Sequence, residues 1–159
     1  MDRNSTYSRY DALLQLLRTA NTIWDASRQF FEQWDLSPSQ FNVLNLLQSH
    51  SEGLSQIELG RQLLTHRSNV TGLVDRLERR GLVERRNVLS DRRVYRVVLT
   101  RAGDKLLKVI LPHYHREAQH LWDGVSDERI AELLGALERV TGNAAKVVSL
   151  ENGGADKEK

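Results

Sequence analysis

Cysteine is absent from this chain of 159 residues, and proline and methionine are scarce. The absence of cysteine excludes a disulfide framework, a cysteine-ligated zinc site, a thiol nucleophile and thiol-based redox sensing. No apolar run approaches the roughly 20 residues that a helix needs to cross a bilayer. The first thirty residues include Asp11 and Asp25 and lack the apolar core and cleavage site of a signal peptide. We therefore expect a soluble cytoplasmic protein with no membrane partner.

Motifs of common enzyme classes are also missing. The sequence has no glycine-rich phosphate loop, no nucleophile elbow and no pair of carboxylates whose spacing suggests acid–base catalysis. It therefore predicts a protein that is not an enzyme and that uses no cofactor.

The net charge is only +2, but the positive charge is concentrated in one segment. Residues 61–101 contain eleven arginines, no lysine and four acids, a local charge of +7 that leaves −5 for the rest of the chain. A basic block on a nearly neutral chain favours a polyanion partner. Arginine in particular suits two-pronged contacts with phosphate or guanine. We interpret the block as a nucleic-acid interface, and a solvated face of ion pairs is the alternative.

The N-terminal third predicts three helices. Apolar residues recur at helical spacing over residues 7–34, which indicates a long first helix. Ser37 and Gln40 have the spacing of a capping box at the start of a second helix, and Ser55 and Glu58 have the same spacing before a short third one. Because the hydrophobic content is 40%, these helices can bury a sizeable core.

A fourth helix is expected from Thr65 to Arg80, with Gly81 as its C-terminal cap. Its apolar residues follow helical spacing and should face the core. They are Val70, Leu73, Val74 and Leu77. Two strand-like segments follow at residues 82–86 and 94–99, joined by residues 87–93 as the loop of an extended β-hairpin. The remaining chain predicts a long helix that Pro112 should kink and a last helix that begins at Ser126.

Short helices followed by a hairpin, with arginine on the last helix and at the hairpin tip, indicate a winged helix-turn-helix. Such a helix fits the major groove of duplex DNA while a second helix packs across it. The candidate DNA-binding residues of this helix are Thr65, Arg67, Ser68, Asn69, Thr71 and Arg76. Thr65 and Ser68 suit phosphate contacts, which fix register. Asparagine and arginine can pair with the edges of adenine and guanine.

The hairpin provides a second set of candidates, namely Arg86, Asp91, Arg92 and Arg93. Asp91 precedes Arg93 by two residues and is placed to orient its guanidinium while the loop reaches the adjacent minor groove. A narrow minor groove concentrates negative potential and favours arginine. In isolation these residues would indicate only a surface turn with a weak ion pair. Their position after this helix and these strands favours a wing.

The chain resembles the MarR (multiple antibiotic resistance regulator) family of bacterial transcription factors. The resemblance lies in the segments LSQIELGRQLLTHRSNVTGLVDRLERRGLVER and DRRVYRVVLTRAG, and the order of helices before and after them also fits. It implies that Arg93, the second arginine of the wing tip, enters the minor groove. One departure is the loop Asn87–Ser90, where the family usually has an Asp-Pro-type turn.

The resemblance further implies a homodimer in which the N- and C-terminal helices interlock. The helices outside the winged helix each have an apolar stripe, which is consistent with burial at a dimer interface. The alternative to a dimer is that these helices pack against one another within one chain. A dimer would place two recognition helices roughly 34 Å apart on a pseudo-palindromic site. The fold class is mainly α with a small β-hairpin wing. Its expected parts are an N-terminal dimerisation helix (7–34), a winged helix-turn-helix DNA-binding domain (37–101), C-terminal dimerisation helices (102–149) and a flexible tail (150–159).

Family members commonly bind small phenolic or anionic effectors between the dimerisation helices and the winged helix. The candidate lining residues are Trp24, Trp34, Phe41 and Tyr114, and ordinary core packing is the alternative. Without cysteine the chain cannot belong to the peroxide-sensing branch. His113, Glu117 and His120 share a helical face with metal-ligand chemistry, but we expect a solvated polar face there and no metal.

Alternatives to sequence-specific DNA binding remain open, because winged helices also bind RNA or other proteins. Exposed arginine at the wing tip and a polar recognition face are unnecessary for a module that binds only protein. Binding without sequence preference would indicate an architectural role. The sequence favours a dimeric, sequence-specific regulator of transcription, a repressor that a small effector releases from duplex DNA.

Overall fold

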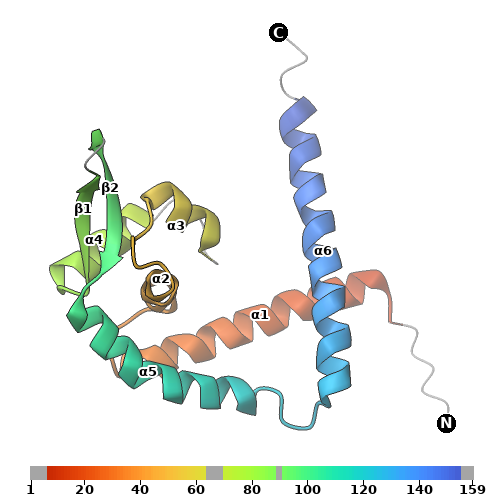
Figure 1. Ribbon diagram of the computed structural model, residues 1–159. Helices are drawn as coiled ribbons and strands as arrows, with labels where there is room; N and C mark the ends of the chain where they lie inside the picture. Colours follow the sequence, from red (N-terminus) through yellow and green to blue (C-terminus); the bar gives the residue numbers. More distant parts are fainter. Residues whose placement is uncertain (1–6, 64–69, 89–90, 155–159) are drawn as a thin grey trace, which may run out of the picture. The chain divides into compact units, whose positions relative to one another are not determined.

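The computed structural model describes residues 7–63, 70–88 and 91–154, with the backbone alone for 88, 91–94 and 147–154. It contains six helices and a two-stranded antiparallel sheet among the described residues (Figure 1). The elements are α1 (Arg9–Glu32), α2 (Pro38–Gln48), α3 (Gln56–Gln62), α4 (Val70–Arg79), β1 (Val83–Val88), β2 (Asp91–Leu99), α5 (Arg101–His120) and α6 (Asp127–Gly154). The chain divides into two compact units, Met1–Ile110 and Leu111–Lys159. The mainly helical fold with a small hairpin is confirmed.

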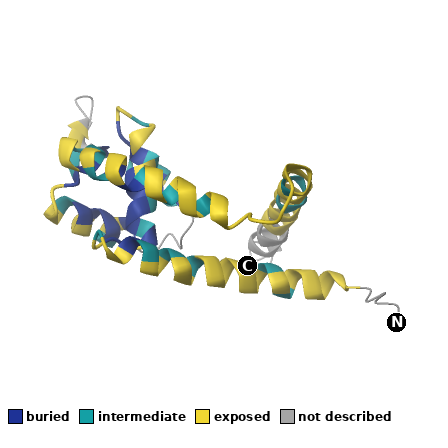
Figure 2. Cartoon of the chain, turned by 90° about the horizontal axis from the view of Figure 1, so that it is seen from below, coloured by how far each residue is buried: buried dark blue, intermediate teal, exposed yellow. Residues whose placement is uncertain are grey.

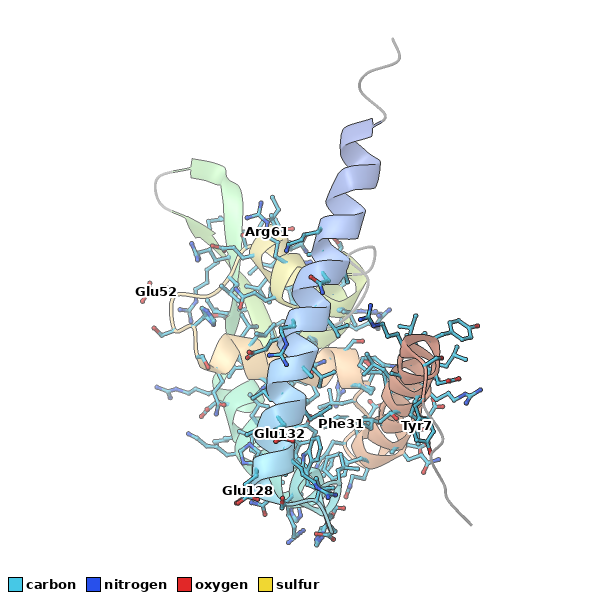
Figure 3. The ribbon with its side chains drawn as sticks, turned by 90° about the vertical axis from the view of Figure 1, so that its right-hand side faces the viewer. Tyr7, Phe31, Glu52, Arg61, Glu128 and Glu132 are labelled. Carbon is cyan, nitrogen blue, oxygen red and sulfur yellow. The ribbon has the colours of Figure 1, made fainter. Side chains whose placement is uncertain are left out.

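Helix α1 is long and buries little of itself within the chain. A capping box of Ser8 and Asp11 starts it, and Phe31 at its other end is 1% exposed. Tyr7 projects from its N-terminal end, whereas Phe31 lies beside α2 (Figure 3). Between them the apolar side chains of Leu13, Leu17 and Ile23 are exposed. Most of α1 is accordingly coloured as exposed in Figure 2.

The core of the first unit is centred on α2. The predicted capping box is present, because the Gln40 N–H donates to the Ser37 hydroxyl and the Ser37 N–H to the Gln40 side chain. Phe41 is 1% exposed and stacks on Phe31, with ring centroids 4.3 Å apart. The remaining buried apolar side chains of α2 are Val43, Leu44 and Leu47. Dark blue residues therefore gather around this helix in Figure 2.

Helices α3 and α4 follow the sequence prediction where they are described. Ser55 and Glu58 form the expected capping box, and hydrogen bonds from the Ser55 N–H and hydroxyl lower the pKa of the Glu58 carboxyl. The four predicted core residues of α4 are all buried. Gly81 ends α4 in the left-handed region with φ 68°, and the Leu82 N–H donates to the Leu77 carbonyl over 3.0 Å. This is the glycine cap that the sequence indicates.

The hairpin is longer than predicted, and the assignment of all of 87–93 to a loop is wrong. β1 extends to Val88 and β2 begins at Asp91. The register pairs Val83 with Leu99 through to Asn87 with Tyr95, and then shifts so that Val88 lies opposite Asp91. A β-bulge absorbs extra residues on one strand and lets pairing resume beyond them. A periodicity argument on either strand alone could not detect this.

A further main-chain pair joins the loop before α3 to the hairpin. The Leu54 N–H donates to the Val97 carbonyl over 3.0 Å, and the Val97 N–H donates to the Leu54 carbonyl over 2.8 Å. Gly53, next to this bridge, has φ 74°. The bridge fixes the hairpin against the start of the helix-turn-helix.

The second unit has no core of its own among its described side chains. None of residues 111–146 is buried, and its apolar side chains are largely exposed. Among them are Leu121, Trp122, Val125, Leu133, Leu134 and Val140. α5 continues through Pro112 as one helix. α6 extends to Gly154, past residue 149, where the sequence analysis expects the helices to end. No helix in the described part of the chain is long and apolar enough to span a membrane.

Candidate nucleic-acid interface

Helix α4 has one buried and one exposed face. Thr71 and Arg76, both predicted DNA contacts, are exposed, as is Asp75. The Thr71 hydroxyl donates to the Gln56 side-chain carbonyl over 3.3 Å, which joins the starts of α4 and α3. The outward face predicted from periodicity is therefore present between Val70 and Arg79. Four other candidates lie outside the described residues. They are Thr65, Arg67, Ser68 and Asn69.

Arg85 of β1 joins the hairpin to α4. Its main-chain N–H donates to the Glu78 carboxylate over 3.0 Å, and its guanidinium contacts the carboxylates of Glu78 and Asp75. The same guanidinium lies 5.4 Å from the centre of the Tyr95 ring, within cation–π range. Burial alone would lower the pKa of Arg85, but its hydrogen bonds to Asp75, Tyr95 and Glu78 raise it above the ordinary value.

The role of Arg85 was missed from the sequence, where it was counted only as part of the basic block. One signal was available, because Asp75 and Glu78 are three residues apart and therefore share a face of α4. Which arginine they bind depends on how the hairpin folds back, and the sequence does not specify that. The two acids and Arg85 hold helix and wing as one body.

Two more arginines of the basic block also bind within the chain. Arg96 donates to the Gly53 carbonyl over 3.0 Å and lies 3.4 Å from the Glu58 carboxylate. Arg80 donates to main-chain carbonyls at the end of α1. The alternative of an ion-paired face thus holds for part of the block, while Arg61 and Arg76 are exposed on α3 and α4 (Figure 3 labels Arg61).

The wing candidates lie on the two strands. Arg86 is exposed on β1 and contacts the Glu84 carboxylate at 2.6 Å, two residues earlier on the same strand. Asp91 begins β2, and Arg92 and Arg93 follow it beside the bulge. The side chains of these three lie outside the described residues, so their predicted contacts remain predictions.

A cavity of about 550 Å³ lies between the C-terminal half of α1 and the start of α2. Trp24, one of the four predicted effector-pocket residues, lines it together with Arg28, Glu32 and Asp35. Phe41 stacks in the core on Phe31.

The other two predicted pocket residues are not among those that line this cavity. Trp34 packs against Phe30, with ring centroids 5.2 Å apart. Tyr114 belongs to the second unit. Most of the other lining residues, which lie between Arg28 and Gln40, are polar or charged, and Leu36 and Pro38 are the apolar exceptions. They were missed because a search for aromatic residues cannot find them.

The histidines of α5 have local partners. The Nδ1 of His113 lies 2.8 Å from the Arg116 guanidinium, and that of His120 lies 3.2 Å from the Asp123 carboxylate. Within the described part of the chain, no three ligand-type side chains are grouped to hold a metal ion.

Comparison with known proteins agrees with this geometry. A family profile described as MarR family matches residues 34–94. The transcriptional repressor MprA of Escherichia coli (strain K12) is 33% identical over 84 residues, which cover 53% of this chain and 48% of MprA. Thus the chain matches only about half the length of that relative. The HTH-type transcriptional regulator MhqR of Bacillus subtilis (strain 168) is 30% identical over 129 residues, covering 81% of this chain and 88% of MhqR.

Solved structures share the fold. An S. aureus MepR–DNA complex superposes with a TM-score of 0.75 at 23% identity, covering 86% of this chain and 99% of that one. CouR from Rhodococcus jostii RHA1, solved with p-coumaroyl-CoA bound, has a TM-score of 0.74 at 25% identity. The match covers 86% of this chain and 95% of CouR.

Proposed function

The chain belongs to the MarR family of DNA-binding transcriptional regulators, and from that premise we propose that it is a homodimeric repressor of pseudo-palindromic operators that a small effector releases. The observation that carries the proposal is the exposed polar face of α4 together with a hairpin that Arg85 holds to the same helix. A helix–wing body of this kind suits simultaneous contact with a major groove and the adjacent minor groove.

Each DNA-facing residue has a proposed role. Arg67, Asn69 and Arg76 pair with base edges in the major groove, and Thr65, Ser68 and Thr71 contact phosphates or the groove wall. These six residues form the proposed DNA-contact surface of the recognition helix. In the wing, Arg93 enters the minor groove, Asp91 orients it, and Arg86 and Arg92 contact the backbone. Such a regulator acts where the chromosome lies, in the bacterial cytoplasm.

Dimerisation is proposed from unsatisfied apolar surface. Leu13, Leu17 and Ile23 are exposed along α1, and none of the described side chains at 111–146 is buried. Exposed apolar stripes on three long helices are unusual for a monomer and are typical of protein interfaces. A second copy of the chain would cover them and bring two α4 helices to neighbouring half-sites of one operator.

The cavity beside α1 is the proposed effector site. Its volume of about 550 Å³ falls within the range of small-molecule sites. Trp24 supplies an aromatic wall and Arg28 a cation, which suits an aromatic or anionic molecule. Release of DNA requires the effector to bind the DNA-free conformation more tightly than the DNA-bound one.

Replacement of Arg76 by alanine should weaken binding to the preferred duplex about 10- to 100-fold and relax base preference at one position of each half-site. The reason is that Arg76 is exposed on the face of α4 that we propose enters the groove. The measurement is fluorescence anisotropy with the best duplex from a random pool and with its single-base variants. Arg129→Ala removes the same charge from an exposed site on α6 and should leave binding unchanged. Equal loss on every sequence would make Arg76 a phosphate contact.

A further inference from the structure

Arg80, directly after α4, binds the end of α1. Its guanidinium donates to the main-chain carbonyl of Asp35 and, over 3.0 Å, to that of Trp34. The Asp35 carboxylate lies 3.7 Å from the same group. The bonded residues are 45 and 46 positions apart in the sequence, so local structure does not require these contacts.

The end of α1 provides acceptors for a cation from elsewhere. The Leu36 N–H donates to the Phe31 carbonyl and the Asp35 N–H to the Glu32 carbonyl, while Asp35 adopts φ 52°. This is the paired pattern that closes a helix through a left-handed residue. The carbonyls of Trp34 and Asp35 follow at the negative end of the helix dipole, where a cation is favoured, and both accept from the Arg80 guanidinium. The last turn of α1 contains no basic residue of its own, and Arg80 supplies the charge.

Arg80 is placed to fix the orientation of α4. The middle of α4 is held by Arg85 through Asp75 and Glu78, which attaches it to the hairpin. Immediately after Arg80 the chain turns at Gly81 with φ 68°, so Arg80 anchors the C-terminal end of α4. The turn that it binds also forms part of the cavity wall, because Asp35 and Leu36 line the cavity.

We propose that Arg80 is a positioning residue for DNA binding: it does not contact DNA, but holds α4 against the turn at residues 34–36, so that the operator affinity depends on the conformation of that turn. This inference rests on the proposed DNA-binding function of α4. It assigns to one member of the basic block a role other than phosphate contact.

The first test compares Arg80→Ala with Arg79→Ala by measuring duplex affinity at several salt concentrations. Arg79 is the adjacent exposed arginine, and its side chain bonds only within its own helix among the contacts described. We expect Arg80→Ala to lower affinity about tenfold with an unchanged slope of log K against log salt. Loss of a phosphate contact would reduce that slope by about 0.9. A reduced slope for Arg80→Ala would overturn the proposal.

The second test changes the turn instead of the arginine. Asp35→Gly removes the carboxylate but permits φ 52°, whereas Asp35→Val removes it and disfavours that conformation. Asp35→Val should lower the duplex affinity about as much as Arg80→Ala, whereas Asp35→Gly should bind like the parent. The double variant Arg80→Ala/Asp35→Val should bind DNA no more weakly than either single variant. Additive losses would overturn the proposal.

Amide hydrogen exchange along Val70–Arg79 in the free protein gives a readout that does not require DNA. Exchange should be faster in Arg80→Ala and Asp35→Val, and unchanged in Arg79→Ala and Asp35→Gly. Arg80→Lys, which keeps the charge and one donor, should be intermediate. Uniform protection of α4 in all variants would refute the positioning role. If the parent protein prefers no duplex, the proposed function fails, and exchange still decides whether Arg80 positions α4.

Discussion

Replacement of Gly53 by alanine should destabilise the protein by about 2–4 kcal/mol, the range of a severe steric and backbone defect. A Cβ at this position would lie 2.4 Å from the Val97 carbonyl oxygen and 2.5 Å from the Val98 Cγ1. Val97 is completely buried and its carbonyl accepts the Leu54 N–H. Since the obstacle is main chain fixed in a strand pair, no side-chain rotation can relieve the overlap. Gly53 also has φ 74°, where a side chain is strained.

Gly81→Ala is the matched control. Gly81 has φ 68°, so it suffers nearly the same conformational strain, but a Cβ there would meet nothing within 4 Å. We expect it to cost about 1 kcal/mol. Urea unfolding at a fixed protein concentration measures both variants and avoids confusion with subunit association. Equal unfolding free energies for the two variants would show that close packing of the 53–54 loop on β2 does not stabilise the fold.

Replacement of Arg85 by alanine should weaken operator binding about 30-fold, the scale expected when charge-assisted hydrogen bonds are lost. Arg85 joins β1 to the carboxylates of Asp75 and Glu78 on α4. Without Arg85 the carboxylates of Asp75 and Glu78 repel each other on the DNA-facing helix α4, and the hairpin loses its fixed orientation. The wing should then contact DNA only part of the time. Anisotropy titrations with the preferred duplex measure the loss.

The neighbouring arginine provides the comparison for Arg85. Arg86 is exposed on the same strand, and we propose that it contacts phosphate. Arg86→Ala should reduce the salt slope by about 0.9 and weaken binding about tenfold or less. Arg85→Ala should leave the slope near its original value. The reverse pattern would contradict the assignment of Arg85 to structure and Arg86 to DNA.

Local chemistry made much of the fold predictable. The capping boxes at Ser37 and Ser55 form as expected because their donors and acceptors are only three residues apart. The stripe of Val70, Leu73, Val74 and Leu77 is buried because one helical period determines which side chains share a face. Gly81 turns the chain for the same local reason.

Contacts between distant residues were not predictable. The bridge from Leu54 to Val97 and the pairing of Arg80 with the end of α1 join segments more than forty residues apart. Periodicity also could not show that Phe41 would stack in the core while Trp24 lines a cavity. The sequence shows the basic block as a unit, but Arg80, Arg85 and Arg96 each bind a different element of the chain, a division that depends on the tertiary fold.

The measurement that tests the central claim most directly is binding to the intergenic DNA beside the protein's own gene. Fluorescence anisotropy compares this duplex with a scrambled duplex of equal length and composition at two salt concentrations. The account predicts binding to the intergenic duplex that is at least about 1,000-fold tighter than to the scrambled one, and that weakens on both as salt increases. Equal affinity for the two duplexes, or no binding to either, would contradict a sequence-specific regulator acting at this site.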